Sequence, residues 1–474
     1  MSQANDVPIT DKLAFFMMRE LQPVMSFPRR SFPQRRLMAE QIDPSDDLIL
    51  ENDMIKLLFD PQTHLLSSMT DKSNWQTTAL QQEFLYYESN SATEIQASGA
   101  YIFRPKEQHA NPFTKQAAQL KKRNGKIVAE MQQIIDASVS QIIRLNKGSR
   151  VVEFEYTIGP IDVSDGVGRE IITRYSTKID SQDTFYTDSN GRDVMKRVRN
   201  YRPTWKLENS DEPLASNYYP VTNFIFINDT RQAMTIVTDR SQGGSSLVNG
   251  QIELMLHRRA LYDDDLGVGE PLDETEGGID HSTNQRIGRG LVITGKHYLM
   301  LSDMNKKESF ALQYRQLQMR VNHPIQMIFA PFQTVEQYTN ERIVSDSIIN
   351  TDSLHSAISV LTLYPLGDDE LLLRLSHHIG LDEMCSDAVE VTVDITNLFS
   401  THHFSAVIAV REYSLTNTVP IEEMLEDQLH WSNESEISIQ NQLKQMQNEL
   451  SNSMTVTIRP MEIRTFRVKF ATPN

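Results

Sequence analysis

The sequence predicts a mostly β protein, in which a large antiparallel β-sandwich is followed by a smaller C-terminal β domain. Apolar and polar residues alternate in residues 150–158 and 454–470, and this period of two is typical of half-buried strands. Asn-Gly dipeptides at Asn124, Asn190 and Asn249 suit the positive φ angles of tight hairpins. Helical periodicity is scarce. We therefore expect antiparallel sheets joined by short turns.

Three parts are expected along the chain. Residues 1–48 are expected to form the end of a small β domain and a linker, because prolines and paired arginines are frequent in this segment. Residues 49–325 contain most of the alternating segments and are expected to form the large sandwich. Residues 326–474 are expected to form the C-terminal β domain, with one short helical candidate at 421–429. Asn, Gln, Ser and Glu are enriched in residues 432–453, which predicts a polar insertion.

Composition narrows the classes of partner. The 474 residues include 63 Asp and Glu against 46 Lys and Arg, a formal charge of −17 that argues against nucleic acid as the main partner. The basic clusters 121–126 and 196–202 are interpreted instead as a hairpin tip and a strand edge. One cysteine, Cys385, excludes an intrachain disulfide and a cysteine-rich zinc module. No segment has the ~20 apolar residues of a membrane span, and residues 1–12 lack the apolar core of a signal peptide.

Motifs for metal and nucleophile chemistry are absent from the sequence. None of the 12 histidines opens a His-x-Asp pair, and neighbours such as His377-His378 and His402-His403 point to opposite faces of a strand. The carboxylates of the run Asp263–Asp265 also point alternately to opposite faces of an extended chain, so they do not converge on one cation. No Gly-Lys-Ser/Thr or Gly-x-Ser-x-Gly motif occurs. The sequence therefore does not support a serine hydrolase, and we expect no metal site made from this chain alone.

Four polar stretches combine Asp, Arg, Asn and aromatic residues, at 186–192, 217–220, 239–247 and 253–269. Aromatic rings stack on the apolar faces of sugars, and planar amides and carboxylates bind sugar hydroxyls in pairs. The stretches therefore indicate a possible sugar site. The alternative is a set of charged pairs that hold long loops across a sandwich.

The same stretches resemble the C-terminal part of the family 38 glycoside hydrolases, of the lysosomal α-mannosidase type. The matching motifs include, in chain order, SGAYIFRP (98–105), FYTDSNGR (185–192), YRPTW (201–205), NYYP (217–220), TDRSQGGSSL (238–247), HRR (257–259) and PMEIRTF (460–466). The resemblance is firm from Asn52 onward and implies a galactose-mutarotase-like supersandwich for the large domain.

The resemblance implies a retaining hydrolase of terminal α-linked mannose in oligosaccharides and glycoproteins, which uses two carboxylates and a zinc ion. In the family these groups lie in an N-terminal catalytic domain, for which this chain shows no counterpart. We therefore expect the zinc of the complete enzyme to have no ligand here, and the chain alone to be inactive, with the catalytic domain as its partner. The implied compartment is a lysosomal or secretory lumen. The alternative is a non-catalytic carbohydrate-binding or interaction module.

One residue is expected to contact the sugar. Tyr219, the second tyrosine of NYYP, resembles the family's tyrosine that reaches from the β domain into the sugar site, and the alternative is a core tyrosine on a strand. Asn217, Arg240, His257 and Arg258 lie in matching motifs. For these four the resemblance implies a structural role at the interface with the catalytic domain.

Overall fold

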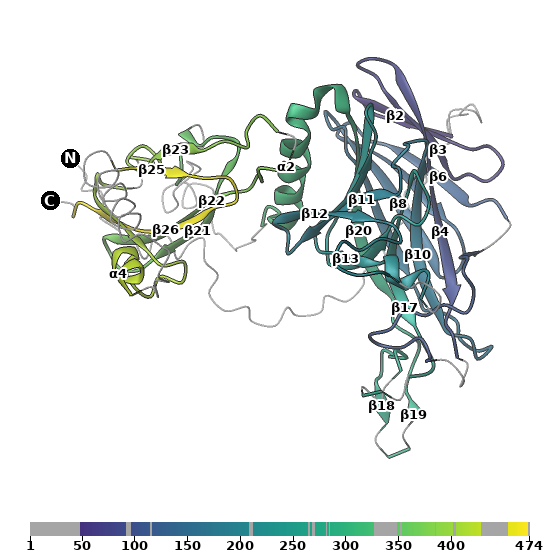
Figure 1. Ribbon diagram of the computed structural model, residues 1–474. Coiled ribbons are helices and arrows are strands. Elements are labelled where there is room, and N and C mark those ends of the chain that lie inside the picture. The colour runs from purple at the N-terminus through teal and green to yellow at the C-terminus, as the bar shows by residue number, and fades with distance from the viewer. Residues whose placement is uncertain are drawn as a thin grey trace, which may run out of the picture. The chain divides into compact units, whose positions relative to one another are not determined.

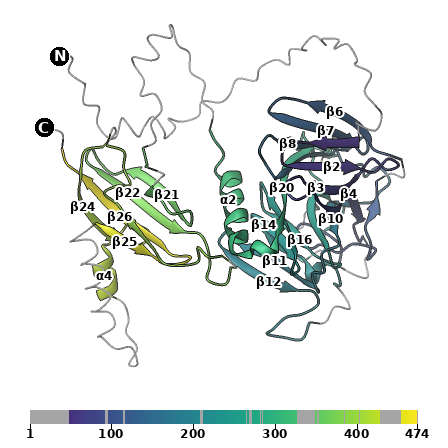
Figure 2. The same cartoon turned by 90° about the horizontal axis from the view of Figure 1, so that it is seen from above.

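The computed structural model describes residues 48–91, 96–113, 116–207, 212–263, 266–267, 271–280, 282–283, 285–326, 348–350, 353–383, 385–401, 404–427 and 454–472. These residues form two compact units, one ending at Pro324 and one beginning at Ile325 (Figures 1 and 2). The linker expected in residues 1–48, apart from Leu48, and the insertion expected at 432–453 lie outside the described residues. Within the described part of the chain, no helix combines the length and the apolarity that a membrane span requires.

The large unit contains two antiparallel sheets of nine strands each. The first sheet has the order β1 (Ile49–Glu51), β2 (Ile55–Phe59), β3 (Leu66–Asp71), β4 (Gln76–Glu88), β10 (Arg169–Thr177), β17 (Gln251–Arg259), β16 (Gln242–Ser245) and β13 (Tyr219–Val221), and β5 (Asn111–Pro112) pairs with β4. The second sheet has the order β12 (Asp193–Val198), β11 (Thr184–Ser189), β14 (Phe224–Asn228), β15 (Gln232–Thr238), β20 (Ile293–Asp303), β9 (Val152–Ile158), β8 (Val139–Asn146), β7 (Val128–Ile134) and β6 (Gln119–Asn124).

The core lies between the inner faces of the two sheets. Strand β9 shows why, since Phe154 and Tyr156 are buried while Glu153 and Glu155, which alternate with them, face outward. The ring of Phe154 meets the ring of Tyr175 on β10 at a centroid distance of 5.5 Å, so the sheets interdigitate across the sandwich. The alternation in the sequence therefore encodes one buried face in each sheet.

A chain of polar side chains crosses this core. The ring of His297 on β20 hydrogen-bonds through Nδ1 to the Tyr175 hydroxyl at 3.1 Å and through Nε2 to Oε1 of Gln242 at 2.8 Å. Gln242 in turn donates from Nε2 to the Tyr156 hydroxyl at 2.8 Å. Complete burial lowers the pKa of His297 from 6.5 to about 3, so this imidazole is neutral in the folded protein above that pH.

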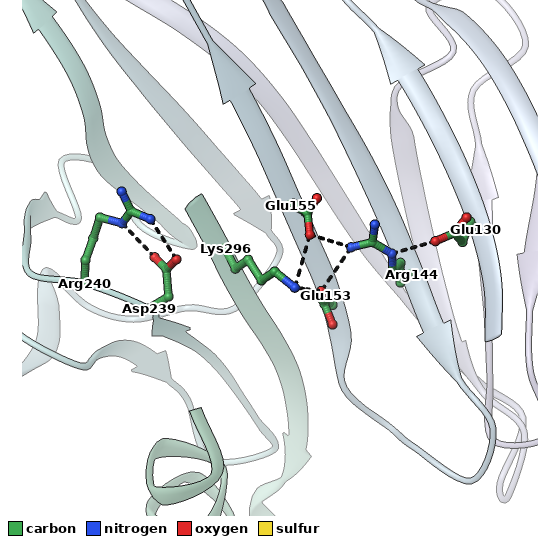
Figure 3. A network of polar contacts seen from close by, with 7 residues as sticks. All are labelled: Glu130, Arg144, Glu153, Glu155, Asp239, Arg240 and Lys296. Carbon is green, nitrogen blue, oxygen red and sulfur yellow. Dashed lines mark hydrogen bonds and ion pairs between the residues drawn. The ribbon is translucent and has the colours of Figure 1, made fainter. Parts of the chain in front are cut away.

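The outer face of the second sheet is divided between a helix and a charged network. Helix α2 (Phe310–Asn322) packs Tyr314 against Phe224 at 4.8 Å, although the sequence analysis expected no helix in this region. Beside it, Arg144 on β8 binds carboxylates of both neighbouring strands, and Lys296 on β20 binds Glu153 at 2.6 Å (Figure 3). In this network three carboxylates, those of Glu130, Glu153 and Glu155, share the two cations Arg144 and Lys296, as expected of a solvated sheet face.

The smaller elements of the large unit are 3-10 helices η2 (Ala215–Asn217) and η3 (Met304–Ser309) and the short pair β18 (Ile279–Asp280) and β19 (Gln285–Arg286). The second unit contains a four-stranded sheet in the order β21 (Ile358–Pro365), β22 (Glu370–His377), β26 (Ile463–Phe470) and β24 (Val407–Tyr413), a pair of β23 (Val391–Asp394) with β25 (Thr455–Ile458), and helix α4 (Ile421–Glu426). Leu371, Leu373 and Leu375 of β22 are fully buried in its core. The predicted fold class, a large antiparallel sandwich with a smaller C-terminal β domain, is confirmed.

Candidate functional site

The NYYP motif lies at one edge of the first sheet. Asn217 ends the 3-10 helix η2, Tyr218 is extended with φ −85° and ψ 138°, and Tyr219 begins the edge strand β13. Tyr219 pairs with Gly244 of β16, where a Cβ would lie only 2.7 Å from the Val221 side chain. Successive side chains of an extended segment point to opposite sides, so the two tyrosines enter different environments.

Tyr218 belongs to a buried network on the outer side of the first sheet. Its hydroxyl donates a hydrogen bond to Glu253, whose side chain is only 2% exposed. Tyr87 donates to the same Oε1 atom at 3.1 Å, and Arg174 binds Oε2 at 2.8 Å. Burial, and next the charge of Glu253, raise the pKa of Tyr218 well above its usual range. Tyr218 is therefore a structural donor to a buried carboxylate.

Tyr219 lies between the two sheets at their open edge and is half-buried. Its ring contacts Phe185 of β11 at a centroid distance of 5.7 Å. The guanidinium carbons of Arg197 and Arg202 lie 4.2 Å and 5.0 Å from the centroid of the same ring. The hydroxyl has no hydrogen-bond partner among the residues that the structure describes. The ring is thus held by its neighbours, while the hydroxyl keeps its capacity to donate and accept.

Asn217 positions the segment that carries Arg202. Its side chain is 1% exposed, accepts from the backbone N–H of Asn200 at 2.8 Å and donates to Oδ1 of Asn200 at 2.7 Å. It also donates to the carbonyl of Pro213 at 3.1 Å. Because all these partners lie near the NYYP motif, Asn217 fixes the approach of residues 200–202 to Tyr219. Its role is structural within this unit.

Arg258 forms a buried ion pair in a different network. Its Nε atom donates to Oε1 of Glu170 at 2.9 Å, and Glu170 is 0% exposed. Arg258 also donates to the carbonyl of Ile102 at 2.6 Å, and Ser98 donates to Glu170 at 2.7 Å. Burial raises the pKa of Glu170, and the positive charge of Arg258 opposes that rise. This pair holds the loop that contains residues 98–102 on the sheet, as the charged-pair interpretation of the sequence expected.

His257 contacts the segment just before β20, and Arg240 pairs with its neighbour in sequence. The Nε2 atom of His257 bonds to the carbonyl of Leu291 at 3.2 Å, and burial lowers the pKa of His257. Arg240 is exposed and pairs with its neighbour Asp239 at 3.0 Å (Figure 3). No contact among the described residues links either side chain to Tyr219. Of the residues singled out in the sequence, only Asn217 therefore joins Tyr219 in one site.

Arg197 and Arg202 were missed as site residues. The sequence analysis interpreted residues 196–202 as a basic strand edge, and β12 is indeed an edge strand of the second sheet. What a linear pattern does not reveal is that this edge meets β13 of the first sheet at Tyr219. The YRPTW motif, which contains Arg202, was the available signal.

The histidines and acidic residues do not form a metal centre in the described chain. No group of three His, Cys, Asp or Glu side chains there is arranged to hold a metal ion. Both ring nitrogens of His377 bond to backbone groups, those of Val389 and Ile379. His402, His403, Asp264 and Asp265 lie outside the described residues. The described side chains therefore give zinc no fitting donor set.

A cavity of about 380 Å³ lies in the second unit, between α4 and strands β24, β25 and β26. Its charged lining includes Arg464 and Glu412, which are both nearly buried. These two side chains bind each other through two hydrogen bonds, of 2.9 Å and 2.6 Å. These two charges of the lining therefore already neutralise each other.

The two tyrosines of NYYP are expected to differ in stability effect. Tyr218→Phe is expected to lower the free energy of unfolding by about 1–3 kcal/mol, because buried Glu253 loses one donor. Tyr219→Phe is expected to change it by less than about 0.5 kcal/mol, because its hydroxyl loses no partner among the described residues. Urea unfolding at neutral pH measures both. Equal losses in the two variants would contradict the different environments assigned to them.

Comparison with known proteins gives consistent results. The model of the glycosyl hydrolases family 38 C-terminal domain matches residues 50–265. Lysosomal alpha-mannosidase of Bos taurus is 37% identical over 457 residues, which cover 94% of this chain and 42% of the relative. Alpha-mannosidase of Canavalia ensiformis is 33% identical over 419 residues, 88% of this chain and 41% of the relative. The chain thus spans about two fifths of the length of these curated relatives.

A solved structure shares the fold. The crystal structure of an alpha-mannosidase from Enterococcus faecalis V583 aligns with a TM-score of 0.52 and 14% sequence identity, over 89% of this chain and 42% of that one. At this identity the likeness concerns the fold alone. The resemblance drawn from the sequence motifs is confirmed by the family match and by the sequence relatives.

Proposed function

The chain belongs to the C-terminal part of the family 38 glycosyl hydrolases, and from this premise we propose that it is the β region of an α-mannosidase. The reaction proposed for the complete enzyme is hydrolysis of terminal α-linked mannose with retention of configuration. The names of the mammalian and plant relatives, which match along most of the chain, support this proposal. We propose a lysosomal or secretory lumen as the compartment, and the name of the Bos taurus relative, which specifies the lysosome, supports the first of these.

In the complete enzyme, this chain and a catalytic domain contribute different groups to the reaction. Nucleophile, acid/base and zinc ligands are assigned to residues outside these 474. The contribution of this chain is the hydroxyl of Tyr219, a phenol that can donate to a mannose hydroxyl. The observation that supports this role is the geometry of Tyr219, whose ring is held by Phe185, Arg197 and Arg202 while its hydroxyl has no partner in the described chain.

Because the catalytic groups are assigned to another domain, the purified 474-residue chain is expected to have no turnover on an aryl α-mannoside, even with zinc added. Retaining hydrolysis needs two carboxyl groups about 5–5.5 Å apart across the glycosidic bond, and the proposal places both elsewhere. Release of the chromophore at the rate of the uncatalysed reaction is the expected result. Turnover that disappears when any single residue of this chain is mutated would contradict the proposal.

A carbohydrate-binding module is the second candidate, and one observation favours it. Tyr201 and Trp205 are 57% and 60% exposed on the segment that carries Arg202, and exposed aromatic faces suit the stacking of sugars. Titration of mannose oligosaccharides into wild type and Tyr219→Phe separates the candidates. Saturable binding that is lost in the variant supports a module, whereas absence of binding supports a role that requires the catalytic domain.

A further inference from the structure

Two guanidinium groups at the Tyr219 site lack a carboxylate partner. Arg197 and Arg202 are both half-buried, and no Asp or Glu among the described residues lies within ion-pair distance of either. Their neighbours differ in this respect, since Arg199 pairs with Asp183. The chain carries a net charge of −17, so this pair of cations stands against an acidic background.

The two positive charges act on each other. Burial is the main cause that lowers the pKa of Arg197, and the charge of Arg202 lowers it further, while Tyr219 opposes the change. A tyrosine ring attracts a cation only weakly, by about 0.5–2 kcal/mol. The ring therefore offsets only part of the cost of keeping two cations together in a partly buried place. An anion bound between them would remove that repulsion.

The unused donors lie at one place. The Nε atom of Arg197 donates a hydrogen bond to the Thr187 hydroxyl at 3.1 Å, and the two Nη atoms of Arg197 have no partner among the described residues. Arg202 is held by the carbonyls of Tyr201, at 2.9 Å, and Ser216. Since both guanidinium carbons lie within 5.0 Å of one ring centroid, they are at most ~9 Å apart. An oxyanion shared by two guanidinium groups has its central atom ~4 Å from each carbon, so it can bridge guanidinium carbons up to ~8 Å apart, a separation that falls within this limit.

We propose that Arg197, Arg202 and the hydroxyl of Tyr219 bind one phosphate group, free or carried by a sugar. Phosphate suits the site because it offers several oxygens at once to the Nη atoms of Arg197, to the N–H groups of Arg202 that Tyr201 and Ser216 leave over, and to a phenol. Exposed Tyr201 and Trp205 on the same segment offer apolar faces to a sugar that carries the phosphate. This site goes beyond the proposed function, because its ligand is anionic and its occupancy requires no hydrolysis.

Calorimetric titration of the whole 474-residue chain at low salt tests the site, with inorganic phosphate, mannose 6-phosphate and mannose as probes. Both anions are expected to bind saturably, and more weakly as salt is raised. Arg197→Gln and Arg202→Gln are each expected to weaken phosphate binding at least tenfold, and Tyr219→Phe several-fold. Arg199→Gln is the matched control, because Arg199 is the neighbouring arginine already paired with Asp183, and a change of less than twofold is expected.

The relative affinities of the two anions distinguish a sugar-borne phosphate from free phosphate. Tighter binding of mannose 6-phosphate than of inorganic phosphate supports a sugar-borne ligand, and equal binding supports the free anion. The proposal is overturned if neither anion binds saturably, or if Arg199→Gln weakens binding as much as Arg197→Gln does. Thermal unfolding of each variant shows that it is folded, and Arg197→Lys, which keeps the charge but not the fork, is expected to bind between wild type and Arg197→Gln. Because no turnover is measured, failure here is distinct from failure of the α-mannosidase proposal.

Discussion

Replacement of Arg258 by methionine is expected to lower the free energy of unfolding of the large unit by about 3–5 kcal/mol. Arg258 is the cation that binds Glu170, a carboxylate with 0% exposure. Its removal leaves a buried negative charge whose desolvation is no longer compensated, and releases the loop held through the carbonyl of Ile102. Guanidinium chloride unfolding at neutral pH, followed by tryptophan fluorescence, measures the loss.

Two controls make the Arg258 result specific. The double variant Glu170→Gln/Arg258→Met is expected to recover part of the loss, because no buried charge remains. Arg240→Met removes an exposed arginine paired with Asp239 and is expected to cost no more than about 1 kcal/mol. A loss in Arg258→Met no larger than that in Arg240→Met would show that the buried pair does not stabilise the fold.

His297 is expected to make the folded protein less stable in acid. Its pKa is about 3 when folded and 6.5 ordinarily, so between these values the unfolded chain binds a proton that the folded chain does not. Stability therefore falls as the pH falls from 6.5 towards 3. The loss of stability caused by this residue amounts to about 3 kcal/mol at pH 4.5 and about 4 kcal/mol at pH 3, at about 1.4 kcal/mol per pH unit.

Unfolding curves of wild type and His297→Gln between pH 7 and pH 4.5 test this expectation. The variant loses the hydrogen bonds to Tyr175 and Gln242 and is expected to be less stable at pH 7. The gap should narrow by about 3 kcal/mol at pH 4.5, because only the wild type contains this titrating ring. His109→Gln, at an exposed position, controls for the removal of an imidazole. Parallel curves for wild type and His297→Gln would refute the assignment.

The strand pattern was predictable because it depends on short-range periodicity. In β9 the alternation of Phe154 and Tyr156 with Glu153 and Glu155 identified a half-buried strand, and the structure has that strand with that buried face. Helix α2 was missed, although Phe310, Tyr314 and Leu317 recur at helical spacing and are buried on one side. The strand-like alternation in the rest of the chain led us to expect only sheets here, and this single helical segment of 13 residues was overlooked.

The site was only partly predictable. NYYP and its flanking motifs identified Asn217 and Tyr219, and Asn217 does position the segment beside Tyr219. The roles of the two tyrosines follow from the sides to which an extended chain directs them, which the motif does not state. His257 and Arg240 lie in equally clear motifs, yet their partners Leu291 and Asp239 do not connect them to Tyr219 in the described part of the chain. A sequence motif therefore identifies candidate residues, but it does not show which of their side chains are in contact in the folded protein.

The sequence by itself determined the fold class, the order of the β segments and the family, because periodicity and contiguous motifs are properties of the linear chain. The tertiary structure alone decided which charges are neutralised. It pairs Glu170 with Arg258 across neighbouring strands, encloses His297 between two sheets, and places Arg197 and Arg202 over one tyrosine ring without a described carboxylate. The physical reason is that desolvation and Coulomb energies depend on distances between segments far apart in sequence, which only the packing of the two sheets sets.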